Sequence, residues 1–171
     1  MALGPKQALP ASPRTAVVGT GALGMYYGAK LAKSGVPVSF LARRDLAHLQ
    51  KHGIRVLCPY GDFHLHPVQA CGTPQEIGPV DLVLICIKTT GNADLKNLVP
   101  PLLGPDTVVC TLQNGLGNEE WLASIAGKKR IVGGVCHVCV SRPEPGVARN
   151  MACTDIKFSD LSGGDTPRAR S

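Results

Sequence analysis

The sequence predicts an α/β protein with a Rossmann-like, doubly wound, mainly parallel sheet that carries helices on both faces. Three observations predict this fold. Short apolar segments rich in β-branched residues alternate with segments whose apolar residues recur at helical spacing, which is typical of parallel strands joined by helices. The segment "VDLVLICIK" at 80–88 is almost entirely apolar, as expected for a strand covered on both faces. A Gly-x-Gly-x-x-Gly turn follows the first apolar segment.

Composition limits the classes of protein to which the chain can belong. With 44% apolar and 18% charged residues among 171, it is expected to form one globular domain. The net charge of +6 comes from scattered Lys and Arg without interleaved aromatic residues, which disfavours nucleic acid as a partner. No apolar run reaches the roughly 18 residues of a membrane helix, so no membrane contact is expected. Seven cysteines, an odd number and mostly within apolar runs, indicate reduced thiols and a cytoplasmic protein.

The first elements of the chain form a strand–helix–strand unit. Residues 15–19, "TAVVG", predict a buried strand, and residues 22–34 predict a helix whose apolar side chains recur at helical spacing. Gly35 is expected to end this helix, because glycine readily adopts the conformation that follows a helix C-terminus. Residues 36–42, "VPVSFLA", predict the second strand.

A second helix and two strands are expected next. Asp45 is placed to cap a helix that continues through about His52 and ends at Gly53. The sequence then predicts a strand over 54–58, "IRVLC", and an edge strand over 62–69, "DFHLHPVQ".

The second half of the chain continues the alternation of strands and helices. The expected elements are strands over 80–88, 107–113 and 130–140, helices over 92–103 and 116–126, and two short strands over 146–150 and 155–158. Pro100 and Pro101 interrupt the first of these helices, because proline removes a backbone donor. Trp121 and Leu122 are expected to face inward on the second.

The glycine turn has the context of a dinucleotide-binding site, since it follows a predicted strand and opens a predicted helix. Gly19 permits a tight turn, Gly21 allows the backbone to approach a pyrophosphate, and Gly24 allows the helix and strand to pack closely. The N–H groups of the first helical turn and the helix dipole favour phosphate there. The alternative is a glycine-rich turn that holds no ligand.

The end of the second strand favours NADP(H) as the cofactor. NAD and FAD sites usually place an acid there for the ribose hydroxyls, whereas this strand ends in "FLARR" and no acid occurs before Asp45. The same missing carboxylate disfavours S-adenosylmethionine. Arg43 or Arg44 can hold a 2′-phosphate bidentately. The alternative is that both arginines are solvated loop residues.

Two polar residues follow predicted strands at the same edge of the sheet. Lys88 ends "VDLVLICIK" and is expected near a bound nicotinamide or its phosphates. Asn114 ends "LQN" and offers a side-chain amide that can donate to a carbonyl or hydroxyl. The alternatives are that the lysine only terminates a strand and that Asn-Gly is only a favourable turn.

Cys136 and Cys139 form a CxxC sequence, which raises a metal or redox function as an alternative. The surrounding segment is β-like, and residues three apart in a strand face opposite ways. Because the chain contains no second CxxC, packed strand cysteines and no metal site are expected.

Six stretches together resemble the ketopantoate reductase family, the NADPH-dependent 2-dehydropantoate 2-reductases. In family order, from about residue 15 to 170, they are "GTGALG", "LARR", "ICIKTT", "LQNGLGNEE", "IVGGVCHV" and "EPGVARN". Other dinucleotide dehydrogenases share only the first part, so the combination with the arginine, the strand-end lysine and QNG is specific.

The resemblance implies a reaction and a set of site residues. The reaction is hydride transfer from NADPH to the keto group of 2-dehydropantoate, a 2-keto acid, in pantothenate biosynthesis. The cofactor-binding residues that it implies are Gly19, Thr20, Gly21, Ala22, Leu23, Gly24, Arg43, Lys88 and Asn114, with Asn114 also binding substrate. The family's proton donor is a lysine on a separate helical C-terminal domain, which no stretch here matches, so the catalytic residue is unknown.

The chain is therefore expected to comprise a flexible leader (1–13), an NADP-binding Rossmann-like domain (14–160) and the linker into the helical domain (161–171). The favoured function is an oxidoreductase seen as a truncated or fragment chain. The alternative is a non-catalytic NADP(H)-binding module or pseudoenzyme. Besides the small-molecule substrate, the partners left open are a second copy in a homo-oligomer and another chain that supplies the helical domain.

Overall fold

The protein is built on one mostly parallel sheet, as the sequence predicts. The computed structural model describes residues 8–161, 163, 166 and 170. Strands in this part of the chain are β1 (Thr15–Val18), β2 (Val38–Leu41), β3 (Ile54–Leu57), β4 (Phe63–Leu65), β5 (Gln69–Cys71), β6 (Val80–Ile85), β7 (Leu103–Thr111), β8 (Ile131–Ser141) and β9 (Val147–Asp160).

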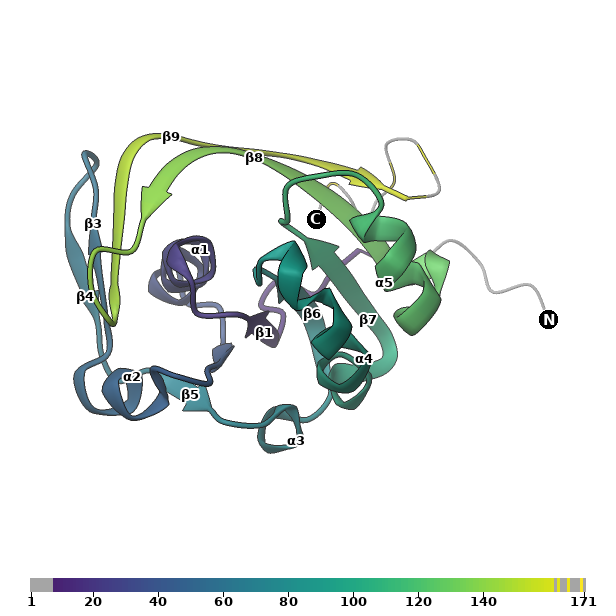
Figure 1. Cartoon of the computed structure of the whole chain (residues 1–171), viewed down its shortest axis with the longest axis horizontal. Coiled ribbons are helices and arrows are strands. Elements are labelled where there is room, and N and C mark those ends of the chain that lie inside the picture. The colour runs from purple at the N-terminus through teal and green to yellow at the C-terminus, as the bar shows by residue number, and fades with distance from the viewer. Residues whose placement is uncertain (1–7, 162, 164–165, 167–169, 171) are drawn as a thin grey trace.

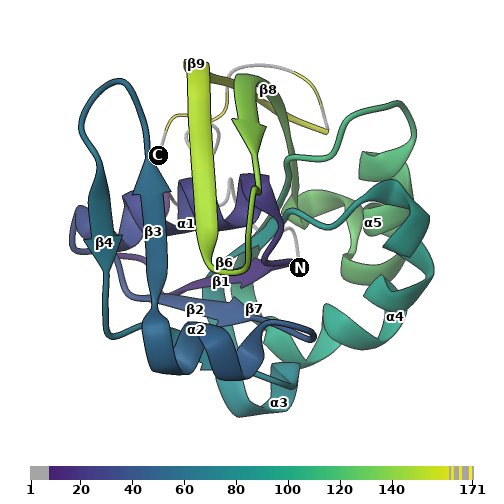
Figure 2. The same ribbon diagram turned by 60° about the vertical axis from the view of Figure 1, so that its left-hand side comes forward.

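The order of the strands is β4-β3-β9-β8-β7-β6-β1-β2-β5. Strands β5, β2, β1, β6, β7 and β8 pair in parallel. Strand β9 pairs antiparallel with β8, and β3 then pairs in parallel with β9 and antiparallel with β4. Figures 1 and 2 show that this second part of the sheet curves around α1 (Ala22–Lys33), which lies in the resulting hollow.

Helices cover both faces of the sheet, because alternate residues of each central strand face opposite ways. Val17 and Leu84 belong to the core around α1, whereas Val18 and Ile85 belong to the core under α3, α4 and α5. The remaining helices are α2 (Leu46–His52), α3 (Pro74–Ile77), α4 (Leu95–Leu98) and α5 (Asn118–Ala126), with 3-10 turns η1 (Thr89–Asp94), η2 (Pro100–Leu102) and η3 (Lys128–Arg130). In the described part of the chain, none of the helices is both long and apolar enough to cross a membrane.

Residues 62–69 do not form the single edge strand that the sequence predicts. They contribute β4, which is an edge strand, and the start of β5, which lies at the opposite edge of the sheet. Pro67 lies between the two strands, where the chain turns. The prediction missed this division because the segment is continuous in β propensity, whereas the pairing partners of the two strands are far apart.

The two short strands predicted over 146–150 and 155–158 form one strand, β9. Its pairing with β8 shifts register around Cys139, and Cys153 has a positive φ of 56° at the irregularity. The side-chain amide of Asn150 donates to the carbonyls of Ala152 and Cys153, at 3.1 and 2.9 Å, and bridges the bulge. The predicted break is therefore a bulge within a continuous ladder.

The helices of the second half are shorter than predicted. Residues 92–103 contain the end of η1, then α4 and η2, and β7 begins at Leu103. Helix α5 begins at Asn118 rather than at residue 116, because Gly117 takes a left-handed conformation at its N-cap. Leu122 is fully buried as predicted, whereas Trp121 is only partly buried.

Candidate functional site

The carboxyl ends of β1, β6 and β7 border a crevice made of two cavities with volumes of about 350 and 480 Å³. Both cavities are lined by Gly21, Lys88 and their neighbours in the two loops, so the cavities join there. The first extends to the end of β2, and the second extends to the end of β7 and along β8. The structure thus brings together the glycine turn, Lys88 and Asn114, as predicted from their places at strand ends.

The three glycines of the turn have different structural roles. A Cβ on Gly19, where φ is +109°, would lie 2.7 Å from Cγ2 of Ile87, and a Cβ on Gly24 would overlap the carbonyl oxygen of Gly19. These two glycines are needed for the turn to pack on its neighbours. A Cβ on Gly21 would meet no atom of the described chain within 4 Å, and Gly21 lines both cavities. The space beside Gly21 is therefore available to a ligand.

The start of α1 offers backbone donors to this space. Gly21 is the N-cap residue, and no side chain caps the helix. The first N–H groups of a helix have no acceptor within it, and the helix dipole makes this end positive. The turn therefore fits a pyrophosphate, whose oxygens would accept from these N–H groups.

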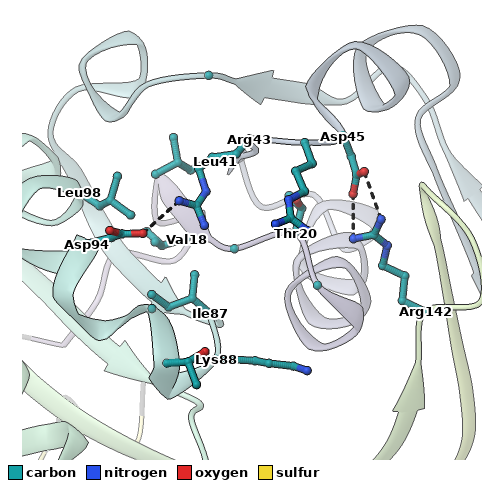
Figure 3. Close-up of a pocket in the computed structure, with 16 residues that line it drawn as sticks. Val18, Thr20, Leu41, Arg43, Asp45, Ile87, Lys88, Asp94, Leu98 and Arg142 are labelled. Carbon is teal, nitrogen blue, oxygen red and sulfur yellow. Dashed lines mark hydrogen bonds and ion pairs between the residues drawn. The ribbon is translucent and has the colours of Figure 1, made fainter.

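Arg43 and Arg44 line the first cavity at the end of β2. Arg43 Nη1 forms an ion pair with Asp94 Oδ2 at 3.0 Å, and the two side chains are 74% and 48% exposed (Figure 3). No described residue accepts from the other N–H groups of Arg43. The guanidinium can therefore bind a further anion without leaving Asp94.

Asp45 is the N-cap residue of α2, but its side chain does not cap the helix as predicted. Its carboxylate instead accepts two hydrogen bonds from Arg142, from Nη1 to Oδ2 at 2.9 Å and from Nη2 to Oδ1 at 3.1 Å (Figure 3). Asp45 is buried, and Arg142 comes from the loop between β8 and β9. The carboxylate turns to Arg142 because a buried charge needs a paired partner.

The first cavity is electropositive. Its charged side chains are Arg43, Arg44, Lys88, Arg142, Asp45 and Asp94, an excess of two positive charges. The second cavity is lined mostly by apolar side chains of α1, of β8 and of the segments that follow β6 and β7, with the exposed Lys88 and Asn114 among its polar residues. An anionic group is therefore favoured at one end and a flat, less charged group at the other.

The remaining predicted residues are distributed along the crevice. Thr20 lines the first cavity, and Ala22 and Leu23 line the second. Gly24 lines neither cavity, because it packs beneath Gly19. Sequence reasoning missed Arg142 and Gln113, which lines the second cavity. Gln113 could have been found from its place beside Asn114, whereas nothing local indicates Arg142.

Cys136 and Cys139 face opposite sides of β8, as predicted. Cys136 is half-buried and lines the second cavity, and burial raises its pKa to about 11. Burial also raises the pKa of Cys86, which lines the same cavity. Cys139 is exposed on the other face. Within the described ranges, no group of three or more His, Cys, Asp or Glu side chains is arranged to hold a metal.

Comparison with known proteins identifies relatives of the chain. Residues 15–163 match the family described as ketopantoate reductase PanE/ApbA. A 2-dehydropantoate 2-reductase from Nostoc sp. is 38% identical over 149 residues, which cover 87% of this chain and 47% of that protein. The chain spans about half the length of the curated relatives it matches.

Solved structures share the fold. A crystal structure of 2-dehydropantoate 2-reductase from Geobacter metallireducens is 46% identical, with a TM-score of 0.87 over 90% of this chain and 51% of that one. A ternary structure of D-mandelate dehydrogenase with NADH and anilino(oxo)acetate is 20% identical, with a TM-score of 0.79 over 91% and 51%, and shows the fold alone. The family match over residues 15–163, together with the relatives from Nostoc and Geobacter, establishes that the chain belongs to the ketopantoate reductase PanE/ApbA family.

Proposed function

We propose that the chain is the dinucleotide-binding part of an NADPH-dependent 2-dehydropantoate 2-reductase. The observation that carries the proposal is the space beside Gly21, where a Cβ would meet no atom of the described chain although the glycines on either side of it in the motif are closely packed. A glycine that the fold does not need, placed where two cavities join, is what a backbone approach to a pyrophosphate requires. The names of the relatives supply the substrate, 2-dehydropantoate.

The choice of NADPH over NADH rests on the end of β2. Arg43 and Arg44 line the cavity there, and Arg43 retains N–H groups for a 2′-phosphate. The nearest acid, Asp45, is buried, and Arg142 already donates to both of its carboxylate oxygens, which weakens it as an acceptor for ribose hydroxyls. A phosphate is therefore favoured over a bare ribose at this position.

The other end of the crevice would receive the nicotinamide and the substrate. When bound, NADPH supplies the hydride. Lys88 lines both cavities and would present its ammonium group between them, and the side-chain amide of Asn114, which lines the second cavity, would donate to a keto oxygen. The apolar walls formed by Leu112, Val138 and Val140 would exclude water from this end. We assign no general acid among the described residues.

The cytoplasm is the proposed location of the protein. All seven cysteines are free in the described chain, and several are buried in the core. Such thiols are typical of a reducing compartment.

A comparison of glycine variants tests the cofactor site. Gly21 has a φ of −76°, which alanine adopts easily, but alanine is a poorer N-cap residue than glycine. Because these two effects oppose each other, Gly21→Ala should change the melting temperature only slightly. The added methyl group would occupy the space of the pyrophosphate, and overpacking of this kind costs about 1–3 kcal/mol, a roughly 5- to 150-fold loss of NADPH affinity. Calorimetric titration measures the affinity, and thermal unfolding measures the stability.

Two further variants serve as controls. Gly104→Ala, where a Cβ would make only ordinary contacts, should change neither quantity. Gly24→Ala should lower the melting temperature, because its methyl group would overlap the carbonyl oxygen of Gly19. Unchanged NADPH affinity in a folded Gly21→Ala protein, or no NADPH binding by the unaltered chain, would refute the proposed cofactor site.

A further inference from the structure

Three side-chain amides connect the two loops at the nicotinamide end of the crevice. Gln113 Nε2 donates to the backbone carbonyl of Ile87 at 2.9 Å and to Asn92 Oδ1 at 2.7 Å. Asn92 Nδ2 donates to Asn118 Oδ1 at 3.1 Å. Asn118 Nδ2 donates in turn to the carbonyls of Asn114 and Gly115, at 3.2 and 3.3 Å. Residues from η1, from the loop after β7 and from the start of α5 thus form one continuous chain of hydrogen bonds.

The chain of hydrogen bonds runs in one direction. It begins at the carbonyl of Ile87, which can only accept, and this fixes Nε2 of Gln113 as the donor. Oδ1 of Asn92 then accepts and its Nδ2 donates, and the same assignment repeats at Asn118. Turning any of the three amides would place donor against donor or acceptor against acceptor, so the orientation of each side chain is determined by its neighbours.

The amide relay, defined as Gln113, Asn92 and Asn118, connects the backbone next to Lys88 with the backbone of Asn114. Ile87, whose carbonyl accepts from Gln113, directly precedes Lys88. The carbonyl that accepts from Asn118 at the other end belongs to Asn114 itself. Gln113 and Asn118 are 9% and 4% exposed, so the bonds at both ends of the relay are largely shielded from water.

Two further contacts hold the relay in place, one at its middle and one at Gln113. The Trp121 indole Nε1 donates to the backbone carbonyl of Asn92 at 3.2 Å, and Thr111 Oγ1 donates to Oε1 of Gln113 at 3.2 Å. The relay therefore rests on β7 at one side and on α5 at the other, and it cannot shift without moving one of these elements.

From these contacts we infer that the amide relay is a positioning device that fixes the spacing of Lys88 and Asn114 across the crevice. The inference rests on the proposed function, in which these two residues border the nicotinamide. The relay residues act through the backbone of the two loops. Breaking the relay should weaken binding at the nicotinamide end and leave the adenosine end, around Arg43, unaffected.

The test compares two ligands in a variant that breaks the relay without adding charge. Gln113→Met keeps a side chain of similar length and removes all its hydrogen bonds. NADPH spans the crevice, whereas 2′,5′-ADP reaches only the adenosine end. We expect Gln113→Met to lower NADPH affinity roughly tenfold, because it breaks two shielded bonds from Nε2, and to leave the affinity for 2′,5′-ADP unchanged.

Gln50→Met is the matched control. The amide of Gln50 donates to the carbonyl of Ala70 at 3.0 Å, away from the relay, so this variant should bind both ligands normally. A merely structural role for Gln113 would lower both affinities together in its variant. That result, or an unchanged affinity for NADPH, overturns the inference.

A second relay variant provides the same comparison if the first does not fold, and a double-mutant cycle tests whether the relay acts as a unit. Asn92→Ala breaks the relay in its middle at a partly exposed position, and it replaces Gln113→Met in the comparison if the latter does not fold. Because the relay acts as a unit, the double variant should lose no more NADPH affinity than Gln113→Met alone. Fully additive losses overturn the inference.

The inference and the proposed function fail in different ways. If the unaltered chain binds neither NADPH nor 2′,5′-ADP, the proposed function itself is wrong, and the positioning inference falls with it. If the unaltered chain binds both and the relay variants affect them equally, only the inference is wrong. Trp121 is the single tryptophan, so its emission should also change in the relay variants and stay constant in Gln50→Met.

Discussion

Arg43→Ala should weaken NADPH binding while leaving NADH binding nearly unchanged. Hydrogen bonds to a charged group contribute about 1.5–3 kcal/mol. Arg43 is 74% exposed and already paired with Asp94 at 3.0 Å, and exposed pairs are worth at most about 1 kcal/mol. Solvation of the exposed guanidinium and its ion pair with Asp94 both reduce the free energy that Arg43 gains from contact with a phosphate. We therefore expect Arg43 to contribute about 1–2 kcal/mol, so that Arg43→Ala lowers NADPH affinity roughly 5- to 30-fold.

The assay is titration of both cofactors into both proteins at one ionic strength, since salt screens such contacts. Arg55→Ala is the control, because it makes the same change of charge at an exposed position on β3, outside the residues that line the crevice. Asp94→Asn should act in the opposite direction and raise NADPH affinity by up to about fivefold, because it releases Arg43 from its ion pair. Equal losses for NADPH and NADH in Arg43→Ala would refute the assignment of the 2′-phosphate to this side chain.

Two other predictions concern the walls of the crevice. Arg142→Met leaves the buried carboxylate of Asp45 without its partner. Because Arg142 itself is partly exposed, the free energy of unfolding measured by urea titration should fall by about 2 kcal/mol, as for a buried acceptor left unsatisfied, and should recover when Asp45→Asn is added; no loss would contradict the structural role of the pair. Because burial raises the pKa of Cys136 to about 11, its thiolate is scarce at neutral pH, so iodoacetamide should label it slowly there and faster as the pH rises toward that value. NADPH should slow the labelling of Cys136 and leave that of the exposed Cys139 unchanged, as measured by peptide mass spectrometry; an equal labelling rate of Cys136 with and without NADPH would contradict this.

The parts of the site that could be predicted depend on local sequence. Lys88 and Asn114 follow apolar strands, and the carboxyl ends of parallel strands meet at one edge, so their proximity follows from the order of elements alone. The glycine turn is a local motif in the same sense. Its division into packing glycines and one open glycine required the structure, because the contacts of Gly19 and Gly24 include atoms far away in the chain.

The parts that could not be predicted depend on partners distant in sequence. Asp45 pairs with Arg142, which is 97 residues away, and no feature near either residue indicates the other. Gln113 finds its acceptors at Ile87 and Asn92, 26 and 21 residues earlier. The bulge in β9 was interpreted as a gap for the same reason, since the continuity of the strand comes from its long pairing with β8.

The unequal roles of the three glycines have a consequence for how the family's signature should be interpreted across genomes. The fold itself requires Gly19 and Gly24, because a side chain at either position would clash. A family member that no longer binds a coenzyme would therefore still need both glycines. On the proposed function, only the pyrophosphate requires glycine at position 21, so the residue at this position is the better marker of which members use a dinucleotide.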